Sequence, residues 1–79
     1  MRAVRRLGKT PKERGDTTAA TGSPDIIELD DGDFAVIGSD ITDQIGVQPL
    51  HDARCAAGER IVRISRATLI SAKSDIPEL

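Results

Sequence analysis

Three aspartates flank one glycine in the stretch LDDGDFAVIG, and carboxylates this close together are the first candidates for chemistry in the chain. The acids are Asp30, Asp31 and Asp33. A calcium loop of the EF-hand type needs acidic ligands at alternating positions and a glutamate at its end, and this stretch has neither. An Asp-Gly pair between two β-prone runs is instead a strong signal for a tight hairpin turn. We therefore expect a turn here rather than a metal site or an acid–base site.

His51 and Cys55 are the other residues whose types could do chemistry, and their spacing is that of half a zinc site. A structural zinc ion takes four ligands, and the chain holds no other histidine or cysteine. A zinc ion shared between two subunits stays open as an alternative. A cysteine–histidine nucleophile pair needs a third, orienting group and a cleft, and the sequence has no phosphate-binding glycine loop or hydrolase motif. We therefore expect a non-enzymatic protein with no catalytic residue, no metal site and no cofactor.

Charge divides the chain into two unequal parts. Residues 1–14 carry a net charge of +5, and residues 15–79 carry −7. The basic side chains of the first part are Arg2, Arg5, Arg6, Lys9, Lys12 and Arg14. Such cations could contact a nucleic-acid backbone, but the acidic part would repel it, and Phe34 is the only aromatic residue on which a base could stack. We expect the cations to be solvated, and weak nucleic-acid binding through them is the alternative function.

The composition of residues 1–24 predicts a disordered basic arm. The alternative is that these residues are an extension that results from a wrongly assigned start site. The stretch GKTPKERGDTTAATGSP, residues 8–24, is rich in Gly, Thr, Pro and charge and has no apolar periodicity. We expect the folded domain to span residues 25–79. The single cysteine, the lack of a signal-peptide pattern and the lack of a long apolar run indicate a cytoplasmic protein without a membrane partner. We expect no small-molecule substrate, because a chain this short leaves little room for a substrate pocket of ordinary size in a monomer.

Two short β-prone runs, DIIEL and DFAVIG, predict a hairpin at the start of this domain. Asp31 and Gly32 between them fit a two-residue type I′ turn. This turn would set the strand register and place Ile26 opposite Ile37 on the outer face. The residues expected on the core face are Ile27, Leu29, Phe34 and Val36.

A short helix, an irregular connection, a strand and a final helix should follow the hairpin. Residues 39–46 carry the capping and stop residues of a short helix, and residues 47–58 have no regular pattern. ERIVRIS, residues 59–65, predicts the third strand. Ser65 is placed to cap a helix that ends between Lys73 and Asp75 and carries an apolar stripe of Leu69, Ala72 and Ile76. The predicted order is β–β–α–β–α, an α+β fold around a small three-stranded antiparallel sheet.

The predicted domain has an apolar outer surface that a partner could cover. A unit of about 55 residues buries little apolar surface by itself, and a partner or a second copy is a common remedy. We expect the interaction surface to consist of Ile26, Ile37, Ile61 and Arg63.

Two segments of the chain resemble a known group of proteins. The segments DIIELDDGDFAVIGSDITD and GERIVRISRATLISAKSDIPEL resemble small actinobacterial hypothetical proteins of unknown function. The outline of strand, turn and strand, with ERIVRIS leading into a helix, is also distantly similar to the BldB/DUF397 group. Proteins of that group are commonly encoded beside helix-turn-helix regulators and are thought to act with them in developmental control. The resemblance implies a regulatory partner rather than a catalyst.

These patterns together predict a small interaction or regulatory protein. It would form a homodimer or bind a DNA-binding transcriptional regulator of the helix-turn-helix class. The acidic charge of residues 15–79 suits contact with a basic, DNA-reading surface.

Overall fold

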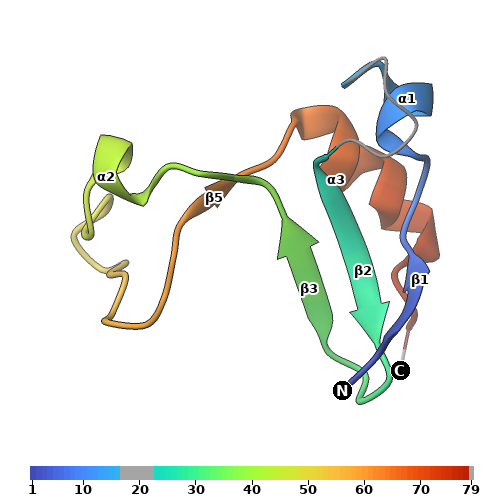
Figure 1. Ribbon diagram of the computed structural model, residues 1–79, viewed down its shortest axis with the longest axis horizontal. Coiled ribbons are helices and arrows are strands. Elements are labelled where there is room, and N and C mark those ends of the chain that lie inside the picture. Colours follow the sequence, from blue (N-terminus) through green and yellow to red (C-terminus); the bar gives the residue numbers. More distant parts are fainter. Residues whose placement is uncertain (17–22, 79) are drawn as a thin grey trace.

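The computed structural model describes residues 1–16 and 23–78 and shows an α+β fold (Figure 1). The elements in chain order are β1 (Ala3–Arg6), α1 (Pro11–Arg14), β2 (Asp25–Leu29), β3 (Phe34–Ile37), β4 (Ser39–Asp40), α2 (Thr42–Ile45), β5 (Val62–Arg63), α3 (Arg66–Ala72) and the 3-10 turn η1 (Lys73–Asp75). The first three strands form an antiparallel sheet in the order β1-β2-β3, and β4 pairs with β5 in a separate ribbon. None of the helices in the two described ranges has the length and the apolar stretch that crossing a membrane requires.

The third strand of the sheet comes from the N-terminus, inside the segment for which the sequence predicts a disordered arm. That arm, residues 1–24, is not confirmed, because β1 pairs with β2 and α1 follows it. Beyond β1, the Leu7 N–H donates to the Ile26 carbonyl at 2.8 Å. Thr10 and Glu13 cap α1 reciprocally, since each side chain accepts from the backbone N–H of the other. Residues 17–22 of the predicted arm lie outside the described residues.

The hairpin between β2 and β3 has a three-residue loop, residues 30–32, and not the predicted two-residue turn. The Leu29 N–H donates to the Asp33 carbonyl at 2.9 Å, and the Gly32 N–H donates to the Leu29 carbonyl at 3.1 Å. A type I′ turn would require a positive φ at Asp31 as well as at Gly32. Among the described residues only glycines have a positive φ, and Gly32 has a φ of 92°. The longer loop confines the left-handed conformation to the residue that tolerates it.

The longer loop shifts the pairing of β2 and β3 by one residue, so the predicted register is wrong. Ile26 lies opposite Val36 rather than opposite the next residue along β3. Because side chains alternate between the two faces of a strand, a shift of one residue exchanges the faces of β2. Phe34 and Val36 stay on the core face, and Ile26 joins them there in place of Ile27 and Leu29.

β4, α2 and β5 belong to a lobe beside the sheet, residues 39–63 (Figure 1). The predicted strand over residues 59–65 is reduced to β5, and it pairs with β4 rather than with the hairpin. The predicted element order β–β–α–β–α therefore lacks β1, α1 and β4. The Thr42 side chain is buried between the two halves of the lobe, where its Oγ1 donates to Asp40 Oδ1 at 2.7 Å and accepts from the Ile61 N–H at 2.8 Å.

α3 packs against β2 and completes a small core. Ser65 Oγ accepts from the Thr68 N–H at 3.1 Å, which confirms the predicted helix cap. The buried hydrophobic residues of the described part are Leu7, Ile26 and Ala72, with Ile64 partly buried against them. The core therefore depends on the N-terminal segment as much as on the hairpin.

Two glycines allow close approaches that hold these parts together. Gly8 has a φ of 77°, and a Cβ at this position would lie 2.6 Å from the Ser71 carbonyl oxygen of α3. Gly38 joins β3 to β4 and lies against the Arg63 carbonyl, which a Cβ would overlap. Both positions require a residue without a side chain.

Candidate functional site

An apolar groove lies between α3 and the sheet. It is a cavity of about 210 Å³ lined by Leu7, Ile26, Phe34, Leu69 and Ile76, which we call the apolar groove. Leu7 and Ile26 are buried and form its floor. Phe34, Leu69 and Ile76 are each about half exposed. The groove is therefore open to solvent and is bordered by large apolar side chains.

The groove belongs to a wider excess of exposed apolar surface. In the described part of the chain three hydrophobic residues are buried, whereas twelve large hydrophobic side chains are exposed. Two of the twelve, Phe34 and Val36, lie on the same sheet face as the buried Ile26. A small domain that covers so little of its apolar surface is typical of a chain that a partner completes.

β3 is an edge strand, and no other strand of the described residues pairs with its outer side. Residues that bond to the neighbouring strand alternate with residues that face away from it in an antiparallel pair. Because Asp33 accepts from Leu29 of β2, Ala35 also bonds to β2, and the N–H and C=O groups of Phe34 and Val36 point away from it. These two residues have no other backbone hydrogen-bond partner within residues 1–16 and 23–78.

The two edges of the sheet differ in how well they are protected against pairing. Natural edge strands carry charges, prolines or bulges that discourage the addition of another strand. β1 has the sequence AVRR and an irregular register between Ala3 and Arg5. β3 has the sequence FAVI and a regular register with β2. β3 is therefore the edge to which another strand can add.

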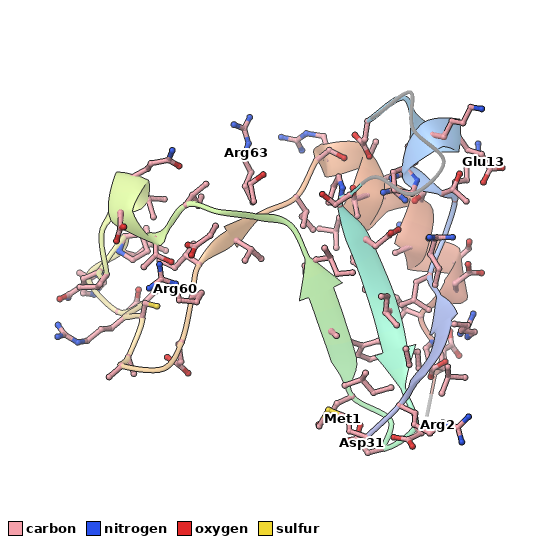
Figure 2. The ribbon with its side chains drawn as sticks, viewed as in Figure 1. Met1, Arg2, Glu13, Asp31, Arg60 and Arg63 are labelled. Carbon is pink, nitrogen blue, oxygen red and sulfur yellow. The ribbon has the colours of Figure 1, made fainter. Side chains whose placement is uncertain are left out.

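Opposite charges lie at the two ends of β3. Asp30, Asp31 and Asp33 surround its hairpin end, and none of them forms an ion pair with another described residue. The Arg2 N–H donates to the Asp30 carboxylate at 3.1 Å, and the Arg2 side chain lies on the β1 side of the sheet (Figure 2). Arg63 of β5 lies beyond the other end of β3, where its side chain projects into solvent (Figure 2).

A second arginine near Arg63 is already neutralised within the lobe. Arg60 contacts the Asp40 carboxylate at 2.8 Å. The Thr42 backbone N–H and hydroxyl also donate to Asp40, and together with Arg60 they lower the Asp40 pKa from 3.8 to about 2. The same contact raises the pKa of Arg60. Arg63, in contrast, has no acidic partner among the described residues.

The structure does not bring the four predicted interaction residues onto one surface. Ile26 is 8% exposed and belongs to the core. Ile37 ends β3 on the opposite face of the sheet from Ile26. Ile61 and Arg63 lie in the lobe, apart from the sheet (Figure 1). The register shift explains the position of Ile26, and the pairing of β5 with β4 rather than with the hairpin explains the positions of Ile61 and Arg63.

Sequence reasoning missed the groove because its residues come from four separate segments of the chain. Leu7 lies after β1, Ile26 in β2, Phe34 in β3, and the remaining two at the C-terminal end. The one local signal is the apolar stripe of the final helix, on which Leu69 and Ile76 both lie. That stripe predicts a buried face, and the structure leaves both residues half exposed.

Half of the basic residues predicted for nucleic-acid contact are held in ion pairs. The pairs are Arg5–Glu28 at 2.8 Å, Arg6–Asp25 at 2.7 Å and Arg14–Asp16 at 2.8 Å. The hydrogen bond to Asp25 raises the pKa of Arg6, and the one from Arg14 lowers the pKa of Asp16. Arg2, Lys9 and Lys12 form no ion pair within the described part of the chain. The paired arginines attach the N-terminal segment to the rest of the protein.

His51 and Cys55 do not converge on a common site. The His51 side chain is 95% exposed. Cys55 lines a cavity of about 430 Å³ in the lobe, with Arg54, Glu59 and Arg60 among its neighbours, and His51 is not part of that lining. No group of three or more His, Cys, Asp or Glu side chains placed to hold a metal ion occurs among the described residues.

No protein-family model matches the sequence, and no curated protein and no solved structure shows significant similarity to it. The resemblance to small actinobacterial proteins and to the BldB/DUF397 group stays a prediction from the segments quoted above. The apolar groove and the open edge of β3 are the features that support a function.

Proposed function

We propose that this chain is a small protein-interaction module and that its partner covers the apolar groove. The observation that carries this proposal is the imbalance between three buried hydrophobic residues and twelve exposed ones in the described part of the chain. Removing apolar surface from water contributes about 25 cal/mol per Å². Covering the groove would therefore favour association.

The partner that we favour is a basic protein, such as a DNA-binding regulator of the helix-turn-helix class. The net charge of −7 over residues 15–79 supports it, because opposite charges speed association and select partners. Asp31 and Asp33, at the hairpin end of β3, lie close to the groove residue Phe34 in the chain and have no ion pair within the described residues. A homodimer is the second form that such an interaction could take.

Nucleic-acid binding by the N-terminal segment has less support. Arg5, Arg6 and Arg14 already have carboxylate partners. A phosphate would have to compete with those carboxylates, and binding would cost the contacts that hold β1 and α1 in place.

Two neighbouring residues of α3 provide a matched test of the proposal. Leu69 and Ile70 are 57% and 63% exposed, but only Leu69 lines the groove. Either residue can be changed to glutamate without burying a charge. We expect Leu69→Glu to abolish binding to a captured regulator and Ile70→Glu to leave it unchanged.

A regulator is first captured from extract with the wild-type chain. Each purified variant is then titrated with that regulator at fixed salt to measure binding. Circular dichroism verifies that the variants are folded. Equal binding by wild type and Leu69→Glu would contradict the proposal. So would an equal loss in both variants, because that result would point to a general effect on α3 rather than to the groove.

A further inference from the structure

The open edge of β3 and the apolar groove form one surface, because Phe34 belongs to both. Its side chain lines the groove, and its backbone N–H and C=O face away from β2. Val36 has the same outward backbone, and its side chain is 44% exposed on the same face. A surface that offers free backbone groups and an apolar slot side by side fits an extended strand.

We propose that this surface binds one extended segment of the partner protein, which joins the sheet as a fourth strand beside β3. The inference rests on the proposed interaction function and specifies the chemistry of the partner. The segment bonds to the outward N–H and C=O groups of Phe34 and Val36. Every second side chain of the segment lies on the α3 side of the sheet and is apolar, because it packs against Phe34, Val36 and Leu69.

The acids at the hairpin end of β3 define one end of the segment. Asp31 and Asp33 favour a lysine or arginine at the hairpin end, since neither has a basic partner among the described residues. Arg63 lies beyond the other end of β3, but its side chain projects away from the open edge (Figure 2), so charge does not specify that end of the segment. Arg2 does not replace the partner's cation, because its side chain lies on the β1 side of the sheet (Figure 2).

A single strand suits this edge better than a second copy of the whole chain. The lobe extends from the end of β3 on the side of its open edge (Figure 1). A second copy would bring its own sheet and lobe toward this lobe. One added strand needs a spacing of only about 4.8 Å from β3.

Amide hydrogen exchange of the full chain tests the proposal. The probes are two capped peptides, Lys-Val-Ser-Val-Ser-Val-Glu and Glu-Val-Ser-Val-Ser-Val-Lys, which cover the two possible strand directions. In the free chain we expect the Phe34 and Val36 amides to exchange faster than those of Ala35 and Ile37, which bond to β2. One of the two peptides should slow exchange at Phe34 and Val36 by about tenfold or more at saturation.

A control peptide of the same composition with its three valines adjacent should not give this protection, because valines at consecutive positions point to both faces.

Val36→Pro removes an outward N–H while the hydrogen bonds of its neighbours to β2 remain, and we expect about tenfold weaker peptide binding. Val36→Thr keeps that N–H and a similar shape, and it should bind within about twofold of wild type. Should Val36→Pro fail to fold, Leu69→Glu serves as the second variant, with the same loss expected.

Three results would overturn the inference. The first is no protection by either peptide at millimolar concentration, and the second is equal protection by the control peptide. The third is concentration-dependent protection of Phe34 and Val36 without peptide, which would show that a second copy occupies the edge. If Leu69→Glu still abolishes regulator binding in any of these cases, the proposed function stands and only the strand mode is wrong.

Discussion

The Arg14 guanidinium lies against the Asp16 carboxylate, with 2.8 Å between Nε and Oδ2, and the Arg14 side chain is 1% exposed. The same guanidinium lies 3.8 Å from the Asp25 carboxylate and donates to the carbonyls of Lys9 and Pro24. One buried arginine therefore joins α1, the second residue after it and the start of β2. This contact places the N-terminal segment on the sheet and so positions Leu7 in the floor of the apolar groove.

Replacing this arginine should unfold the N-terminal segment or weaken the whole fold. We expect Arg14→Gln to lower the free energy of unfolding by about 3 kcal/mol, because it leaves the Asp16 carboxylate without its buried cation and the Lys9 and Pro24 carbonyls without their donor. Lys12→Gln is the matched control, since Lys12 is exposed and forms no ion pair within the described residues. Urea denaturation measures both variants. An effect of Arg14→Gln no larger than that of Lys12→Gln would show that the buried pair does not stabilise the fold.

The contribution of Asp40 to the stability of the lobe should be lost only in strong acid. The Thr42 N–H and hydroxyl and Arg60 hold the Asp40 pKa at about 2, below its ordinary value of 3.8. Because the folded pKa is the lower one, Asp40 stabilises the lobe fully above pH 3.8, and this contribution is lost as the pH falls through about 2. A carboxyl-carbon NMR titration should show this midpoint.

The variant Thr42→Val tests the cause of the low pKa. It removes the hydroxyl donor and keeps the backbone N–H, so the Asp40 pKa should rise toward its ordinary value. Asp40 titrating at its ordinary value in the wild-type chain would contradict the hydrogen bonds seen at the start of α2.

The hairpin loop can be distinguished from the type I′ turn by two substitutions. Gly32→Ala should destabilise the chain by about 1–2 kcal/mol, because Gly32 has a positive φ. Asp31→Gly should also destabilise it, because Asp31 does not need a positive φ and its Oδ1 accepts from the Asp33 N–H at 2.9 Å. In a type I′ turn the second change would be stabilising. Thermal unfolding of both variants checks the sign, and a higher melting temperature for Asp31→Gly would mean that the two-residue turn forms in solution.

Features with a local cause were predictable from the residues alone. Ser65 caps α3 because its hydroxyl reaches the N–H of Thr68, three residues along the chain. The Asp-Gly pair predicted a reversal of the chain, and the hairpin forms there. The α+β class followed from these short-range patterns. The strand register did not follow from them. It depends on the extra loop residue, which in turn depends on which residues can adopt a positive φ and on which face of β2 is covered by α3.

Long-range pairing placed β1, which no local pattern indicates. Its four residues, AVRR, are all exposed and show no apolar alternation. Its position depends on the pairs Arg5–Glu28 and Arg6–Asp25, which join residues 23 and 19 positions apart, and on the burial of Leu7. A basic, exposed segment of this kind is indistinguishable from a solvated arm until its carboxylate partners are in place.

Composition and short-range signals thus determined the fold class, the hairpin and the capped final helix. Tertiary structure determined the third strand, the register and the groove. The physical reason is that Leu7, Ile26, Phe34, Leu69 and Ile76 meet only when β1 is paired with β2 and α3 lies on the sheet. Neither condition follows from any stretch of the chain read by itself.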